Sequence, residues 1–269
     1  MLWVLLLLLL LLFLLFKRRV SSFTSDSIKI DKVFLLSLPS SSDRRTSFLN
    51  SYNSLKTGLP LEIISGIDTK IPENAEPYKH LVDPERYNNM YTYDTGTPRP
   101  NHTYFNSGAL GCYLGHMEFY KRCFEQNLKY ALIFEDNVTF DPSFVDQLNK
   151  ALEKVPKNFD ILFLTNIFGF VKDTEIKKGM YKIKWVMGTK AYIINVENMK
   201  KYHSLFYPIA NHIDLNYEKL IYNGANVYLT KLQSIHVDLG KSVIGHGSVL
   251  NDIYFTHFTN LKQSDITRI

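Results

Sequence analysis

The chain has 269 residues, of which 45% are hydrophobic and 14% aromatic, enough to bury the core of at least one sizeable domain. Its formal net charge is +5, and the cluster Lys17-Arg18-Arg19 accounts for three of these charges. The rest of the chain is therefore near neutral and has no dense basic stripe, which argues against a nucleic-acid partner.

An uninterrupted apolar run from Leu2 to Phe16 precedes the basic cluster. It is slightly short of the roughly 20 residues that span a bilayer. It is also slightly long for the core of a cleaved signal, and no small-residue cleavage motif comes after it. We expect an uncleaved membrane anchor at residues 1–19 and a short Ser- and Thr-rich stem at 20–30. The basic cluster by itself favours a cytosolic orientation of the domain C-terminal to it.

Hydrophobic patterns predict that strands and helices alternate along the remaining chain. Strands are expected at 32–38, 61–65, 130–134, 160–164, 191–196 and 227–230, and helices at 43–56, 108–126, 142–153, from 197 and at 214–222. A polar segment rich in proline and tyrosine, 68–107, is expected to be a long loop. The alternation predicts an α/β fold with a mainly parallel central sheet, in one domain at 31–245 with a tail at 246–269.

The strand predicted at 130–134 ends abruptly in Glu135-Asp136-Asn137. Open α/β sheets bind their ligands at such strand ends. Carboxylate and amide oxygens suit a hard cation such as Mg²⁺ or Mn²⁺, and a metal ion there could hold a diphosphate. The alternative is a solvated acidic turn with no ligand.

Charged residues come soon after each of the first two predicted strands. Arg44 and Arg45 could fork onto a phosphate or stack on a base, or they could simply be a charged first helical turn, with Asp43 as the N-cap. Asp68 could accept hydrogen bonds from a nucleoside, or it could form a turn after Gly66.

The helix expected at 108–126 opens with several glycines, which permit close backbone packing. Cys112 and His116 share one face of this helix. His116 is either a functional group or a core histidine with its hydrogen bonds satisfied. Cys112 and Cys123 lie about 16 Å apart by helical rise, too far for a disulfide, so both are expected to be free thiols.

Asp214 stands at the start of a predicted helix. It is either an N-cap or a general base that takes a proton from a hydroxyl. His236 and His246 are further candidate ligands for a metal or a phosphate.

Taken in order, these motifs resemble glycosyltransferase family 25, which contains bacterial lipooligosaccharide galactosyltransferases and collagen hydroxylysine galactosyltransferases. The motifs that carry the resemblance are Leu35–Leu38 with Asp43-Arg44-Arg45, Ser65–Asp68, Gly108–His116, Tyr130–Asn137, Gly188–Tyr192 and Asp214. They extend over roughly residues 31–245, and their order is more specific than any one of them.

The resemblance implies a GT-A-like, Rossmann-like fold and inverting transfer of a hexose, galactose or glucose, from a UDP-sugar. The acceptor would be a hydroxyl of a glycan, a glycolipid or a protein, and the domain would face the ER or Golgi lumen. Asp214 would be the base, and Mn²⁺ or Mg²⁺ would bind at Glu135, Asp136 and Asn137. The donor would contact Arg44, Arg45, Asp68, Gly111, His116, Gly188 and Thr189.

The sequence departs from the family pattern at two positions: Asn137 replaces an acidic residue, and Gly115 replaces a serine. A catalytically degenerate member that binds a nucleotide sugar or a glycan without transfer is therefore the main alternative. A membrane-tethered interaction domain is another. Nucleotidyl transfer would need a glycine-rich loop after the first strand, and Pro39–Ser42 contains no glycine.

Overall fold

The computed structural model describes residues 28–93, 105–166 and 174–238. The predicted anchor at 1–19, most of the stem and the tail at 246–269 lie outside the described residues. Among the residues that are described, no helix is both long enough and apolar enough to cross a membrane.

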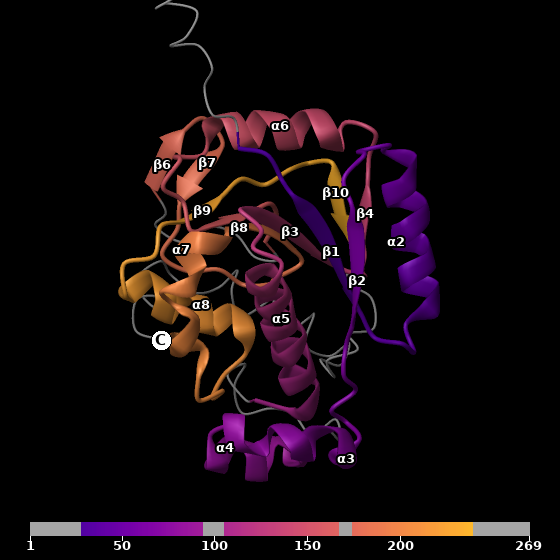
Figure 1. Ribbon diagram of the computed structural model, residues 1–269, viewed down its shortest axis with the longest axis vertical. Helices are drawn as coiled ribbons and strands as arrows, with labels where there is room; N and C mark the ends of the chain where they lie inside the picture. Colours follow the sequence, from indigo (N-terminus) through magenta and orange to yellow (C-terminus); the bar gives the residue numbers. More distant parts are fainter. Residues whose placement is uncertain (1–27, 94–104, 167–173, 239–269) are drawn as a thin grey trace, which may run out of the picture.

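The central element is a sheet in which eight strands of the described chain stand in the order β2-β1-β3-β8-β5-β9-β7-β6 (Figure 1). The strands of this sheet are β1 (Lys32–Ser37), β2 (Leu61–Ser65), β3 (Tyr130–Glu135), β5 (Ile161–Phe163), β6 (Thr174–Lys177), β7 (Met180–Lys182), β8 (Ala191–Asn195) and β9 (Val227–Leu229). A separate antiparallel ribbon pairs β4 (Val138–Phe140) with β10 (Ile235–Val237).

The sheet is mixed. Strand β1 runs parallel to both β2 and β3, and β5 runs parallel to β9. Strand β8, however, is inserted antiparallel between β3 and β5, and β7 is antiparallel to β9 and β6. Most strands therefore point the same way, as the sequence predicts. Because β8 is antiparallel, however, its start lies beside the carboxyl end of β3.

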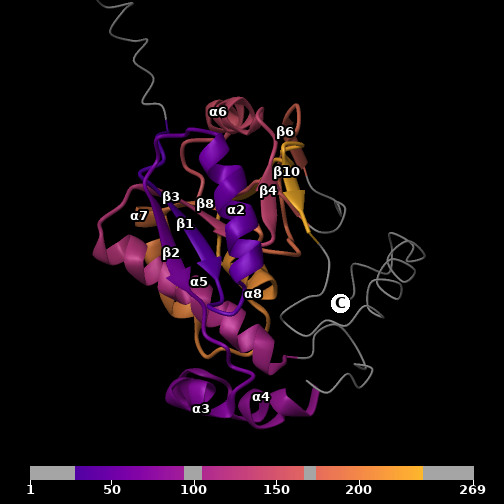
Figure 2. The same cartoon turned by 90° about the vertical axis from the view of Figure 1, so that its right-hand side faces the viewer.

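Helices cover both faces of the sheet (Figures 1 and 2). One core lies under α5 (Ser107–Glu125), α7 (Val196–Lys200), η3 (His203–Phe206) and α8 (Ile213–Tyr222), and the other under α2 (Ser42–Ser54) and α6 (Phe144–Lys154). Along β3 the side chains alternate between these cores, with Ile133 in the first and Leu132 in the second. A strand covered on both faces reads as a continuous apolar run, which is why the sequence alone predicts the strand at 130–134.

The segment predicted as a long loop is helical in its described part. It contains α3 (Pro72–Ala75), η1 (Glu76–Leu81), α4 (Pro84–Asn89) and η2 (Met90–Tyr93), while residues 94–104 lie outside the described residues. Pro72, Pro77 and Pro84, which suggested a loop, instead lie at the starts of helices, because the first helical turn needs no backbone donor. Pro84 begins α4, and the Asp83 side chain caps it by accepting a hydrogen bond from the backbone of Arg86 at 3.1 Å.

Gly111 lets α5 lie directly against the loop after β2. A Cβ atom at this position would stand 2.5 Å from the carbonyl oxygen of Ile67 and 2.7 Å from Thr69 Oγ1. Gly111→Ala should therefore destabilise the fold by about 1–3 kcal/mol, as overpacking does. Urea denaturation measures the loss.

Gly115→Ala is the matched control on the same helix. The three atoms nearest to its Cβ would all belong to the flexible Leu36 side chain, with Cδ1 at 2.6 Å. Because Leu36 can shift, and alanine favours a helix by about 1 kcal/mol over glycine, the loss should be much smaller. An equal loss in the two variants would contradict the assignment of Gly111 as a close-packing residue.

Glu62 connects the edge strand β2 to β1 and α5. Its carboxylate contacts Lys32 Nζ at 2.9 Å and Arg122 Nη1 at 2.7 Å. Burial alone would raise the pKa of Glu62, but the hydrogen bonds from Lys32, Arg122 and Gln126 outweigh it and lower this pKa to about 2.

Because the folded state has the lower pKa, the charged Glu62 adds stability above its ordinary pKa, and this contribution is lost as the pH falls from about 4.5 to about 2. Glu62→Gln should cost about 1 kcal/mol at pH 7 and almost nothing near pH 2, read as urea midpoints at both pH values. Glu125→Gln, on an exposed acid 4.0 Å from Lys121, is the control and should have little effect at either pH. A cost for Glu62→Gln that is independent of pH would contradict the pairing.

Candidate functional site

The polar cluster forms where β3 ends and β8 begins. Because these strands are antiparallel, Phe134 stands opposite Ala191, and the Glu135 amide donates to the carbonyl oxygen of Lys190 at 3.0 Å. The residues before β8, Gly188 and Thr189, therefore lie beside the acidic end of β3. The predicted acidic turn and the predicted Gly-Thr segment, more than fifty residues apart in sequence, are brought together.

Glu135 is the buried centre of the cluster. Thr189 Oγ1 donates to one carboxylate oxygen at 2.8 Å, and Lys190 Nζ contacts the other at 2.5 Å. Burial raises the pKa of Glu135, but Lys190, with His116 in support, outweighs this effect and holds the pKa well below its usual range. The pKa of Lys190 is raised in turn, since the neighbouring Glu135 outweighs burial. The two groups therefore form a buried ion pair.

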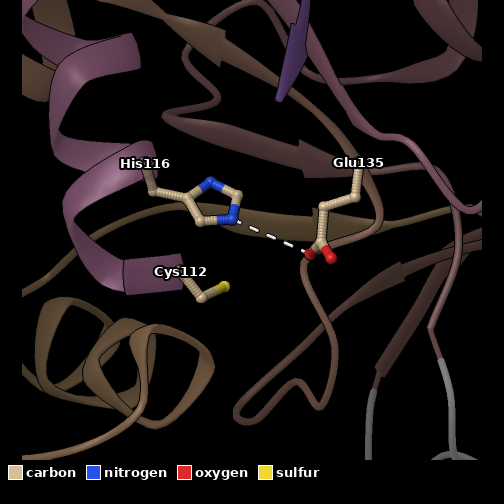
Figure 3. Close-up of side chains that lie close together, drawn as sticks. All are labelled: Cys112, His116 and Glu135. Atoms are coloured by element: carbon tan, nitrogen blue, oxygen red, sulfur yellow. Dashed lines mark ion pairs between the residues drawn. The ribbon is translucent and has the colours of Figure 1, made fainter. Parts of the chain in front are cut away.

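His116 and Cys112 project from α5 toward Glu135 (Figure 3). His116 Nε2 lies 3.8 Å from Glu135 Oε1, is fully buried, and has no hydrogen-bond partner within the described residues. The Cys112 thiol lies close to both groups, with the three ligand atoms within 4.8 Å of one another. Burial raises the pKa of the Cys112 thiol, so at neutral pH it is a protonated thiol. Both cysteines are free, as predicted.

A chain of buried tyrosine hydroxyls holds His116 in place. His116 Nδ1 is 2.8 Å from the Tyr192 hydroxyl, which accepts a hydrogen bond from Tyr217 at 2.9 Å. The Tyr217 hydroxyl is 3.0 Å from that of Tyr120. This network fixes the imidazole ring through one nitrogen and leaves the other facing Glu135. His116 is thus a buried histidine with one nitrogen bonded, and its functional role stays a prediction.

Asp136 and Asn137, the next two residues of the turn, contact other partners. Arg44, on α2, forms an ion pair with the almost fully buried Asp136 carboxylate. Burial nevertheless raises the pKa of Asp136, since its effect exceeds the opposing effect of Arg44. Asn137 donates from Nδ2 to the carbonyl oxygen of Asp238 at 2.9 Å, which fastens the turn to the end of β10.

Asp214 lies in the first turn of α8, where the N-cap position belongs to His212 rather than to Asp214. Its Oδ2 accepts the backbone N–H of Gly188 at 3.0 Å, and its Oδ1 accepts that of Leu215 at 2.9 Å. Gly188 has a φ of +89°, a conformation that favours glycine, so this contact depends on the residue type. The predicted base is thereby joined through Gly188 to Thr189, Lys190 and Glu135.

Other predicted site residues have structural contacts in the described chain. Arg45 donates to the carbonyl oxygen of Leu38 at 3.0 Å and so braces the loop after β1. Asp68 accepts from the backbone of Lys70 at 3.2 Å, which is the predicted turn. Asp43 is in the first turn of α2, and the N-cap residue is Ser41. Their contacts with a donor stay predictions.

Of the two remaining histidine candidates, His236 makes its ion pair with a residue outside this cluster. His236 pairs with Asp141 at 2.9 Å, and both side chains are about half exposed. His246 lies outside the described residues.

Sequence reasoning missed Lys190 as a site residue. It occupies a variable position of the Gly-Thr-x-x-Tyr motif. A single lysine just before a predicted strand is typical of an exposed residue at the end of that strand. In the structure its Nζ pairs with the Glu135 carboxylate at 2.5 Å, and its side chain is only 13% exposed. The one signal in the sequence that could have identified Lys190 is its place directly before the apolar run of β8.

The predicted metal ligands do not fit a divalent cation as the structure arranges them. Both oxygens of Glu135 contact Thr189 and Lys190, and the Asp136 carboxylate is paired with Arg44. Asn137 Oδ1 is buried without a hydrogen-bond partner among the described residues, but it carries no charge. Cys112, His116 and Glu135 are near neighbours, but a protonated thiol and a lysine-paired carboxylate are poor metal ligands.

A family profile described as "Glycosyltransferase family 25 (LPS biosynthesis protein)" matches residues 30–217. The chain belongs to this family. The family assignment made from the ordered motifs is therefore confirmed, and the matched residues include the acidic turn, the Gly-Thr segment and Asp214.

Curated relatives cover part of the same region. A glycosyltransferase 25 family member of Anopheles gambiae is 24% identical over 68% of this chain and 30% of its own length. Procollagen galactosyltransferase 2 of Mus musculus is 22% identical over 65% of this chain and 28% of its own. A mouse relative named inactive glycosyltransferase 25 family member 3 is 27% identical over 50% and 22%. The chain thus spans less than a third of these relatives.

Two solved structures are also similar in outline. A Drosophila galactosyltransferase 7 mutant in complex with manganese, UDP-Gal and xylobiose has a TM-score of 0.38 and 12% identity, over 90% of this chain and 80% of its own. S. aureus TarS has a TM-score of 0.43 and 10% identity, over 88% and 68%. Scores this low assign neither fold nor ligand to the present chain.

Proposed function

We propose that this family 25 protein has a GT-A-like fold and transfers a hexose, galactose or glucose, from a UDP-sugar to a hydroxyl group with inversion at the anomeric carbon. The acceptor would be a hydroxyl of a glycan, a glycolipid or a protein. Family membership supports glycosyl transfer. Asp214, Gly188, Thr189 and Glu135 cluster where β3 ends and β8 begins, and this clustering supports a donor site there.

The observation that carries the proposal is the position of Asp214. Its carboxylate is half-buried and held by the backbone N–H groups of Gly188 and Leu215, which fix its orientation. A fixed carboxylate beside the cluster is what a general base requires. Inverting transfer needs one base and a stabiliser for the leaving group, with no covalent intermediate on the enzyme.

In the proposed reaction, Asp214 takes the proton of the acceptor hydroxyl. The acceptor oxygen forms a bond to the anomeric carbon as the bond from that carbon to the diphosphate oxygen breaks. The electron pair of the breaking bond leaves with UDP. The backbone contact through Gly188 links the position of the base to Thr189, and hence to the acidic end of β3.

A second candidate is a family member that binds the donor or a glycan without transfer. Relatives named inactive and the uncharged Asn137 favour it. Asn137→Asp separates the two candidates. A large gain in UDP release from a UDP-hexose would indicate a weakened enzyme, and no gain would favour a binding protein.

The donor is tested by thermal shift of the full chain with UDP, GDP and CMP and with their sugar conjugates. A ligand at one hundred times its dissociation constant stabilises the folded state by about 2.7 kcal/mol. We expect the shift with UDP and with one UDP-hexose, while the guanine and cytosine nucleotides leave the melting temperature unchanged. A chain that responds to none of the nucleotides would contradict the proposed function.

A further inference from the structure

We propose that Lys190 and Arg44 supply the positive charge that neutralises the donor diphosphate, in place of a divalent cation. The inference rests on the proposed function and specifies how the same site handles the charge of the leaving group. The carboxylates of the acidic turn are already paired with protein groups and so do not fit a metal ion.

Each carboxylate of the acidic turn already has its own cation. Lys190 Nζ lies 2.5 Å from Glu135 Oε2, and the Arg44 guanidinium pairs with Asp136 Oδ1. The third residue of the turn, Asn137, is neutral and fastened by its amide to Asp238. Two negative charges are thus matched by two positive charges, and a metal ion would have to displace one of these cations.

The Arg44 guanidinium is more accessible than a simple core ion pair requires. The Arg44 side chain is 29% exposed, whereas that of Asp136 is 3% exposed, so the guanidinium covers its carboxylate on the solvent side. An anion that approaches Asp136 from solvent therefore meets the Arg44 guanidinium before it meets the carboxylate. The Lys190 side chain is 13% exposed, about as much as that of its partner Glu135 at 11%, so this pair is also partly open to solvent.

The chemistry of these groups suits a diphosphate. A guanidinium forms two parallel hydrogen bonds with phosphate oxygens, and an ammonium acts as a compact point charge. As the bond between the anomeric carbon and oxygen breaks, the electron pair moves onto the departing UDP oxygen, and fixed positive charge stabilises it there. Glu135 and Asp136 then serve to hold the two cations in position.

Calorimetric titration of the full chain with UDP-galactose or UDP-glucose tests the inference, once in excess EDTA and once with Mn²⁺. We expect dissociation constants that agree within about threefold in the two buffers. Binding that appears only with Mn²⁺ would overturn this inference and leave the proposed function standing. Binding in neither buffer would overturn the proposed function, and this inference with it.

Variants of Arg44 test whether its positive charge binds the donor diphosphate. Arg44→Gln should weaken binding in EDTA at least tenfold, and Arg44→Lys should recover part of the loss. If Arg44 only blocks a metal site, Arg44→Gln would instead free Asp136, and the variant would gain a Mn²⁺-dependent affinity. That gain, seen as bound Mn²⁺ by electron paramagnetic resonance, would overturn the inference.

Lys190 is tested in a background that keeps the fold. The double variant Lys190→Met with Glu135→Gln removes both charges of the buried pair and leaves none unmatched. It should bind the UDP-hexose at least tenfold more weakly than the parent chain in EDTA, with an unchanged circular dichroism spectrum. Unchanged affinity in this folded variant would overturn the role of Lys190.

Discussion

Asp214→Asn is expected to lower the rate of UDP release by a factor of about 10²–10⁴, the range that a positioned general base contributes. An amide still accepts a hydrogen bond from Gly188 or Leu215 but cannot take up the proton of the attacking hydroxyl. Donor affinity should therefore change by only a few-fold. Initial rates of UDP release and calorimetric titration of the same preparation separate the two effects.

Glu218→Gln is the matched control because it changes another acidic residue of α8. Within the described chain, the Glu218 carboxylate accepts a hydrogen bond from the exposed Tyr222 hydroxyl, at 3.3 Å, on the solvent side of the helix. The rate of this variant should equal that of the parent chain. If Asp214→Asn keeps most of the turnover, or loses donor binding to the same extent as rate, Asp214 is not the base.

Lys190→Met is expected to destabilise the fold by about 3–5 kcal/mol, the cost of removing one partner of a buried ion pair. Glu135 would then keep a negative charge with a side chain only 11% exposed and no matching cation beside it. Chemical denaturation at pH 7 measures the loss. It is a large fraction of the roughly 5–15 kcal/mol that a folded domain typically has.

The double variant Lys190→Met with Glu135→Gln completes a thermodynamic cycle, because it removes the unpaired negative charge together with the lysine. Most of the lost stability should return. Lys200→Met serves as the surface control, because Lys200 pairs with an exposed Glu197. This variant should change stability by less than about 1 kcal/mol. Equal losses in the single and double variants would show that the ion pair is not what stabilises this part of the core.

The sequence predicts six of the ten strands in the described chain, and several of these six are buried on both faces. The short strands β4, β6, β7 and β10 are not predicted. The runs at β1, β3 and β8 are apolar without interruption, and the helices between them are predicted from periodicity. The acidic turn and Asp214 are likewise visible, since a charged group directly after or before such an element is conspicuous. These features depend only on neighbours in the chain.

The interactions that the sequence does not predict depend on strand order. Lys190 meets Glu135 only because β8 runs antiparallel to β3, and local patterns do not show that arrangement. In the same way, Arg45 and Gly111 are recognised as structural residues only through the distant atoms that they contact. The prolines of the 68–93 segment are ambiguous because proline both ends helices and begins them.

The most direct test of the proposed reaction is the product formed when the full chain is incubated with UDP-galactose or UDP-glucose. Proton NMR recorded before mutarotation monitors both the release of UDP and the anomer of the transferred or hydrolysed hexose. We expect UDP release from one of these α-linked donors with a β-configured product, and loss of both signals in Asp214→Asn. An α-configured product, or no UDP release from either donor by a folded chain, would contradict inverting hexosyl transfer at this site.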